Sequence, residues 1–209
     1  MSEATLKGSS ARLWKLVEAR VQPGADVAAI DQRIWDLFGE EWAIVFTDLS
    51  GFSRQVAKFG IVHFLQIMFE QKQLLLPIVE DHDGILIKIE ADSFLILFKQ
   101  PAHALRCAIA MQKKCASVNA RRSPEEQIIL CVGIGYGKML KIGDDDVFGH
   151  EVNLSSKLGE DIAKGEEILV TRAVRDALPT ATWEEVKADY AGDSVAWRAI
   201  WKSQGPAVG

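Results

Sequence analysis

Apolar residues recur along the chain at two spacings that alternate, one typical of helices and one typical of buried strands. Apolar residues three and four positions apart predict helices, and short apolar runs bounded by turn residues predict strands. Pro77 falls inside one helical segment and should bend or shorten its last turns. The predicted helices are residues 9–21, 27–38, 61–80, 102–119, 150–163 and 171–178, and the predicted strands are residues 42–47, 85–89, 93–98, 128–136, 167–170, 182–186 and 195–201.

The order of these elements predicts an α+β fold. Three residues separate strands 85–89 and 93–98, which is typical of a hairpin. A strand, a long helix, a hairpin, a helix and a further strand indicate helices packed on one face of a mainly antiparallel sheet. Gly133 and Gly135 lie within strand 128–136, so we expect another segment to approach the backbone of that strand closely.

Composition and charge narrow the class of protein. With 209 residues, the chain suits one domain with a short additional element. A net charge of −5 argues against a nucleic-acid surface, which is normally basic, but it allows a small anionic substrate bound through metal ions. We find no signal peptide and no apolar run of membrane-spanning length, so we expect a cytoplasmic protein. Cys107, Cys115 and Cys131 have no CxxC spacing and are expected to be buried free thiols.

Two aspartates stand where predicted strands end. Asp48 follows strand 42–47, and Asp92 lies in the turn of the hairpin. Two carboxylates at one edge of a sheet suit a hard cation such as Mg²⁺, although each aspartate taken alone is more often an ordinary strand-end or turn residue. The turn after Asp48 offers backbone N–H groups at a helix start, which can hold phosphate oxygens. The chain has no P-loop and no GxGxxG motif.

A second polar group lies in the segment DDDVFGHEVNLSSK. Asn153 and Lys157 are four positions apart, so they share one face of the predicted helix, and Asp146 precedes the turn at Gly149. These residues alone are also compatible with an acidic turn followed by ordinary exposed side chains. The four histidines show no metal-ligand spacing and are expected to be surface or partly buried residues: His63, His82, His103 and His150.

Taken together, three blocks resemble the class III nucleotidyl cyclases, the family of adenylyl and guanylyl cyclase catalytic domains. FTDLSGFS is similar to the family's first metal-binding signature, and KIEAD repeats its lysine four positions before a second metal aspartate. The third block repeats the family's aspartate and its asparagine seven positions later, with a lysine at the place of an arginine eleven positions later. The resemblance runs from about residue 42 to residue 170, with all blocks in the family's order.

The resemblance implies a ferredoxin-like class III cyclase fold over residues 41–203, preceded by a helical extension over residues 1–40. It implies that Asp48, Asp92 and the carbonyl of Leu49 hold two Mg²⁺ or Mn²⁺ ions, which activate the ribose 3′-hydroxyl and stabilise the departing pyrophosphate. The roles that it implies for the remaining residues are phosphate binding by Ser50, Gly51 and Phe52, ribose orientation by Asn153, and neutralisation of the α-phosphate charge by Lys157.

In this family the metal half and the transition-state half of a site come from different subunits. Since this chain carries both halves, the resemblance implies a homodimer with two equivalent sites. The N-terminal helices are expected to pack on the cyclase body or across the dimer.

The resemblance places Lys88 and Asp146 against the base, and their hydrogen-bonding character favours ATP. Lys88 only donates and ionised Asp146 only accepts, which matches the N1 acceptor and N6 donor of adenine. Guanine and uracil present the reversed pattern. Cytosine presents the same edge as adenine, so CTP remains a competitor, and a pyrimidine cyclase of the same fold is an alternative.

Three departures from the family pattern leave a second alternative open, a catalytically degenerate cyclase-homology module that binds a nucleotide or a regulatory partner without turnover. Lys157 replaces an arginine and loses its bidentate fork. Ala91 replaces a glycine, which costs roughly 1 kcal/mol if the turn requires positive φ. Lys187 and Lys202 are candidates for a lysine that holds the terminal phosphates, but neither lies in a Lys-Gly context. EADSF does not supply the Gly-Gly-(Asp/Glu)-Glu-Phe hairpin of a diguanylate cyclase.

Overall fold

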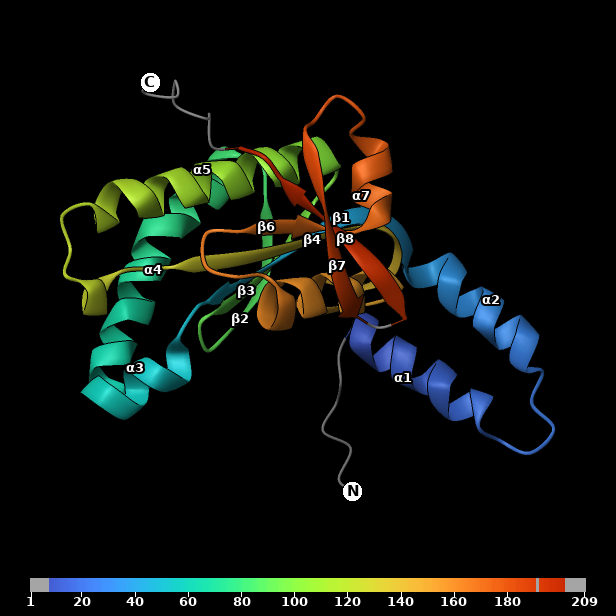
Figure 1. The fold of residues 1–209 in the computed structure, drawn as a ribbon. Helices are drawn as coiled ribbons and strands as arrows, with labels where there is room; N and C mark the ends of the chain where they lie inside the picture. The colour runs from blue at the N-terminus through green and yellow to red at the C-terminus, as the bar shows by residue number, and fades with distance from the viewer. Residues whose placement is uncertain (1–7, 191, 202–209) are drawn as a thin grey trace.

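The computed structural model describes residues 8–190 and 192–201, without the side chains of residues 52–55 and 193. An eight-stranded sheet forms its centre, with strand order β2-β3-β1-β4-β6-β8-β7 and with β5 paired to β4 (Figure 1). All the pairings are antiparallel except that of β4 with β6. The strands are β1 (Gly39–Leu49), β2 (Ile85–Glu90), β3 (Ser93–Phe98), β4 (Leu130–Ile142), β5 (Asp146–Phe148), β6 (Ile168–Val170), β7 (Trp183–Tyr190) and β8 (Asp193–Ala199). The helices are α1 (Ser9–Arg20), α2 (Val27–Phe38), α3 (Phe52–Phe59), α4 (Ile61–Asp81), α5 (Pro101–Asn119), the 3₁₀ turn η1 (Pro124–Glu126), α6 (His150–Ser156), the π-helical turn η2 (Lys157–Ile162) and α7 (Arg172–Ala177).

The central strand β1 is buried on both of its faces. Ala43 and Val45 belong to a large apolar core to which α4 and α5 contribute, and these two helices lie on the same side of the sheet (Figure 1). Ile44 and Phe46 belong to a second core, in which Val152 of α6 packs on the opposite side. The expectation that helices cover only one face is therefore wrong. Hydrophobic spacing shows that a helix has a buried side, but it does not show which face of the sheet that side meets.

Two glycines allow α6 to lie directly on β4. A Cβ atom at Gly133 would lie 2.1 Å from the carbonyl oxygen of Ser155, and one at Gly135 would lie 2.6 Å from that of Glu151. Any other residue would force the helix away, so the prediction of a close backbone approach is confirmed. The Glu151 carboxylate also accepts a hydrogen bond from the Tyr136 amide at 3.0 Å. The position of α6 is thus fixed by the glycines of β4, which allow close packing, and by the hydrogen bond from β4 to the Glu151 side chain.

The two N-terminal helices pack on the body of the protein, one of the two arrangements expected for them. They form an apolar cluster with the C-terminal end of β4, the end that leads into the turn before β5. Buried members of this cluster are Leu13 and Leu16 of α1, Ile34 and Phe38 of α2, and Ile142 of β4.

The structure differs from the predicted elements at several places, and the turn η1 and strand β5 are among the elements that were not predicted. Helix α3 begins where a helix start was expected after Asp48, although no helical range had been predicted there. Strand β4 runs six residues beyond its predicted end at Tyr136, because it continues its pairing with β1 to Leu140 and then pairs with β5. Helix α4 continues through Pro77, since Leu75 and Val79 hold its buried side against the core on either side of the proline. The helix predicted from residue 150 ends at Ser156 and widens into η2.

Candidate active site

The pairing of β1 with β3 brings together two carboxylates that are far apart in sequence. Asp48 is the penultimate residue of β1, and Asp92 lies in the turn between β2 and β3. The pair of Thr47 with Phe94 places that turn beside the end of β1. The Ser93 hydroxyl donates a hydrogen bond to Asp48 Oδ1 at 3.3 Å. The two aspartates singled out in the sequence therefore lie at one edge of the sheet.

Both carboxylates lie in surroundings that disfavour their negative charge. Burial, and after it the charge of Asp92, raises the pKa of Asp48 to about 6. Burial also raises the pKa of Asp92, although hydrogen bonds from the main chain of Asp92 and Leu49 oppose this. Asp92 is only 7% exposed, and its Oδ2 atom has no hydrogen-bond partner among the described residues. A buried carboxylate oxygen without a donor is costly unless a proton or a cation joins it.

The donor set fits a hard divalent cation. In the part of the chain that the structure describes, no three His, Cys, Asp or Glu side chains gather to hold a metal. Asp48 and Asp92 therefore supply two carboxylates and leave the other ligand positions to main-chain oxygen, water or substrate. Mg²⁺ is usually held in this way, by one or two carboxylates together with substrate phosphates.

The turn that carries Asp92 is strained and is held from outside. Ala91 has φ +51°, so the positive φ that would favour glycine is present. The carbonyl oxygen of Asp92 accepts a hydrogen bond of 2.9 Å from the side-chain amide of Gln71, which is fully buried on α4.

Lys88 and Asp146, which are 58 positions apart, form an ion pair. The distance from Lys88 Nζ to Asp146 Oδ1 is 3.2 Å, and both side chains are about one-third exposed. Lys88 also contacts Glu90 at 3.0 Å, and Asp146 Oδ1 accepts the amide of Val147 at 2.9 Å. Burial lowers the pKa of Lys88, but hydrogen bonds to Glu90 and Asp146 outweigh it, so that the pKa is raised. Lys88 therefore stays protonated and remains a hydrogen-bond donor beside the Asp146 carboxylate.

Asn153 and Lys157 lie on the exposed side of α6 and at its end. Lys157 Nζ lies 2.5 Å from Asp161 Oδ2, and the Lys157 side chain is 56% exposed. This hydrogen bond, together with the charge of Asp161, raises the pKa of Lys157. Within the described residues of one chain, neither Asn153 nor Lys157 forms a hydrogen bond or ion pair with Asp48 or Asp92.

The turn after β1 has the expected helix start but one fewer free amide than its sequence suggests. Gly51 has φ +90° and precedes α3, which begins at Phe52. The Ser50 amide already donates to the carbonyl of Ile129 at 2.8 Å, so only the later amides of the turn are available to an anion.

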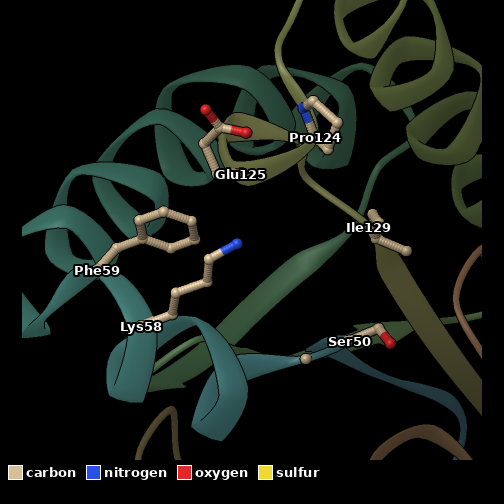
Figure 2. A pocket seen from close by; sticks show the side chains of 7 residues that line it. Ser50, Lys58, Phe59, Pro124, Glu125 and Ile129 are labelled. Carbon is tan, nitrogen blue, oxygen red and sulfur yellow. The ribbon is translucent and has the colours of Figure 1, made fainter.

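This turn also forms one wall of a cavity of about 300 Å³. Figure 2 shows the amine of Lys58 pointing into this cavity, with Glu125 on the far wall. The Lys58 amine lies 4.8 Å from the centroid of the Phe59 ring. The cavity thus brings Lys58, a cation that the sequence reasoning had not singled out, near the turn after β1.

The histidines and cysteines occupy structural positions. His63 and His82 contact main-chain carbonyls at 2.9 and 2.8 Å. His103 lies 3.8 Å from an Asp83 carboxylate oxygen, and His150 is exposed. All three cysteines are buried and free, as predicted, and burial raises the pKa of each thiol to about 12. These thiols are therefore poor nucleophiles.

Sequence reasoning missed two further residues that contact the site. Glu90 is two positions after Lys88 in a strand, so it points to the same face, and this spacing was a usable signal. Gln71 occupies a helical position between apolar residues, and a polar residue in an apolar stripe was the available signal.

The fold matches solved structures of one class. The crystal structure of an adenylate/guanylate cyclase/hydrolase from Silicibacter pomeroyi has a TM-score of 0.68 and 21% sequence identity, covering 78% of this chain and 97% of that one. The adenylyl cyclase CyaB from P. aeruginosa has a TM-score of 0.64 and 16% identity, covering 79% and 96%. At such identities the likeness shows the fold, which is that of the class III cyclases.

The sequence then shows the family. The model of the adenylate and guanylate cyclase catalytic domain matches residues 39–193, and the chain belongs to this family. A protein of Rhizobium meliloti (strain 1021) that carries a provisional adenylate cyclase name is 30% identical over 116 residues, 56% of this chain and 20% of that protein. Serine/threonine-protein kinase pkn2 of Myxococcus xanthus is 25% identical over 131 residues, 63% of this chain and 16% of the kinase. The matches thus span a fifth or less of these relatives.

Within the described residues, no helix combines the length and the apolar character that crossing a membrane requires.

Proposed function

We propose that the protein is a nucleotidyl cyclase that converts ATP to 3′,5′-cyclic AMP and pyrophosphate, as a cytoplasmic homodimer with two Mg²⁺ or Mn²⁺ ions per site. The observation that carries this proposal is the pair of half-buried Asp48 and buried Asp92, in which Asp92 Oδ2 has no hydrogen-bond partner among the described residues. The proposed catalytic domain runs from residue 41 to residue 203, and its last two residues lie outside the described part of the chain.

The carboxylate pair forms the metal half of the proposed site. Asp48 and Asp92, with the carbonyl of Leu49, hold the cations, and the Ser93 hydroxyl orients Asp48. When bound, the two cations lower the pKa of the ribose 3′-hydroxyl and offset the charge of the leaving pyrophosphate. The hydroxyl oxygen attacks the α-phosphorus, the bond to the β-phosphate bridging oxygen breaks, and the hydroxyl proton is lost to solvent.

The turn after β1 binds the phosphate chain in this proposal. Ser50, Gly51 and Phe52 were assigned this role together, and the engaged Ser50 amide leaves it mainly to Gly51 and the amides that follow. Positive φ at Gly51 and the helix start behind it support binding of an anion at this turn. Lys187 is exposed on β7 and Lys202 lies outside the described residues, so neither is assigned to the terminal phosphates.

The Lys88–Asp146 pair selects the base. Of the three Lys88 protons, two are directed to Asp146 and Glu90, which leaves one for adenine N1. Asp146 Oδ2 accepts from the adenine N6 amine. Guanine would place a donor against the lysine and an acceptor against the carboxylate, which costs on the order of 10²-fold in discrimination. CTP shares the adenine pattern and is the competing substrate.

Asn153 and Lys157 act on the nucleotide held by the partner subunit. Both are exposed and neither contacts the carboxylates of its own chain, which supports a site that only a second copy completes. Asn153 orients the ribose. Lys157 exchanges its contact with Asp161 for the α-phosphate, where it offsets the developing charge.

A product assay by mass spectrometry tests this proposal. The protein receives equimolar ATP, GTP, CTP and UTP with Mn²⁺ and then with Mg²⁺, at a concentration at which light scattering shows a dimer. We expect cyclic AMP from the wild type and none from Asp48→Ala. A cyclic pyrimidine product would keep the mechanism and overturn the base assignment.

The absence of any cyclic product would favour a nucleotide-binding module without turnover. The strained Ala91 and the pairing of Lys157 with Asp161 are the two observations that support this second candidate. Nucleotide binding measured by calorimetry would then be retained while turnover is absent.

A further inference from the structure

Helix α4 carries a polar residue in the middle of its buried stripe. The stripe consists of Phe64, Ile67, Gln71, Leu75 and Val79. Gln71 is fully buried, and its Nε2 atom donates a 2.9 Å hydrogen bond to the carbonyl oxygen of Asp92. The amide thus reaches out of the apolar core to the turn that carries one of the two site carboxylates.

That turn needs an external contact to keep its shape. Only Ala91 and Asp92 separate the paired residues Glu90 and Ser93, and Ala91 has φ +51°. A non-glycine residue at this φ is strained, and such strain persists only when the surroundings hold the backbone in place. The Gln71 amide is a contact of this kind, made to the main chain of Asp92 itself.

Burying the Gln71 amide in the core destabilises the folded state, which indicates that this residue serves the turn at Asp92 rather than the stability of the core. Its Oε1 atom is buried and has no partner among the described residues. An unpartnered buried amide oxygen destabilises the folded state, and an apolar side chain of equal size would not carry this cost. The benefit of the glutamine is therefore its one hydrogen bond, which fixes Asp92.

We propose that Gln71 is a positioning residue for Asp92, and that it sets the affinity of the carboxylate pair for divalent cations. This inference rests on the proposed function, in which Asp92 is a metal ligand. Residues that orient metal ligands typically change metal affinity or activity by about 10–100-fold when they are replaced.

The experiment compares Gln71→Met, which keeps length and volume but removes the donor, with Leu75→Met one turn further along the same buried stripe. Binding of Mn²⁺ alone is measured from the electron paramagnetic resonance signal of the free ion, and the Mn²⁺ dependence of activity is measured in parallel. We expect Gln71→Met to weaken Mn²⁺ binding about 10-fold and to raise the half-saturating Mn²⁺ concentration equally, with the rate at saturation within about 3-fold of wild type. Leu75→Met should leave both metal readouts unchanged.

Gln71→Asn is the second variant, for use if Gln71→Met fails to fold. It keeps an amide but shortens it by one methylene, so it should weaken Mn²⁺ binding as well. Wild-type Mn²⁺ affinity in the Gln71 variants, or an equal loss in Leu75→Met, would overturn the inference. The inference would also be overturned if Asp92→Ala left the Mn²⁺ binding of the wild type unchanged, or if the wild type bound no Mn²⁺. A wild type that binds Mn²⁺ through Asp92 but forms no cyclic nucleotide would instead overturn the proposed function, and the binding comparison would still test Gln71.

Discussion

The edge of the sheet that carries Asp48 and Asp92 differs from the α6–η2 segment, which carries Asn153 and Lys157, in how many contacts within one chain fix its side chains. Asp92 is 7% exposed, and its turn is fixed by strand pairing and by the Gln71 amide. Lys157 is 56% exposed, and its amine contacts only the neighbouring Asp161 among the described residues. The first region is organised within one chain, whereas the second presents exposed side chains on a helix that packs directly on β4. This contrast agrees with the proposed site shared between two subunits, in which the metal half is built within each chain and Asn153 and Lys157 act on the nucleotide of the partner.

The largest expected effect comes from removing a carboxylate. Asp92→Ala should lower the rate of cyclic AMP formation by about 10³-fold or more, because cation binding at a reacting phosphate is worth several kcal/mol. The variant should melt no lower than wild type in the absence of metal, since it removes a buried oxygen that has no hydrogen-bond partner among the described residues. Product assay and calorimetry check the two statements. A fully active variant would remove Asp92 from the site.

Mixing two inactive variants tests the contrast directly. Asp92→Ala and Lys157→Ala each lack one half of the site, so a mixed dimer would have one site intact and one doubly defective. With random assembly, about half of the dimers are mixed, and activity should recover to about a quarter of wild type. Activity is measured after subunit exchange, with each variant alone as the control. No recovery, despite exchange confirmed by mass spectrometry, would place both halves on one chain.

Base selection should change by about 10²-fold when the Lys88–Asp146 pair is broken. Lys88→Met and Asp146→Ala each remove one partner of the base edge, so the ratio of kcat/KM for ATP to that for GTP should fall. Glu90→Gln is the matched control, because it keeps a hydrogen-bond acceptor beside Lys88 and leaves Asp146 in place. A ratio unchanged in both test variants would mean that other residues read the base.

A smaller effect is expected for the exposed cation. Lys157→Arg should raise kcat by about 3–10-fold, because a guanidinium can contact two phosphate oxygens at once. KM for ATP should change little if the contact forms only in the transition state. Asp161→Asn serves as the comparison, since it frees Lys157 from its present partner without changing the amine. A lower kcat in Lys157→Arg would contradict the role given to this residue.

The smallest effect is on stability as a function of pH. Because the pKa of Asp48 is raised from 3.8 to about 6 in the folded state, the folded protein binds more protons than the unfolded chain between these values. Without metal, the melting temperature should therefore fall as pH rises from about 4 to about 6, and Asp48→Asn should flatten this slope. Mn²⁺ should restore stability above pH 6 in the wild type only. If Asp48→Asn leaves the slope of melting temperature against pH unchanged, then groups other than Asp48 cause that slope.

The sequence by itself determined which residues could take part in chemistry and in what order they occur. The strand before Asp48, the hairpin around Asp92 and the helix that carries Asn153 follow from local spacing and turn residues, and their motifs identified the family. Gly133 and Gly135 likewise predicted a close contact, because a missing side chain marks such a place without naming its partner.

Only the tertiary structure decided what those residues meet. The distance between Lys88 and Asp146, the burial of Asp92 and the bond from Gln71 depend on strand register and on which face of the sheet each helix covers. These are long-range properties, and residues 21 and 58 positions apart leave no periodic trace of their contact. The turn η2 also makes such a long-range contact, because Gly159 packs where a Cβ atom would lie 3.0 Å from the Phe46 carbonyl oxygen. Local spacing records how a segment folds, whereas packing between distant segments determines the environment in which each carboxylate and cation acts.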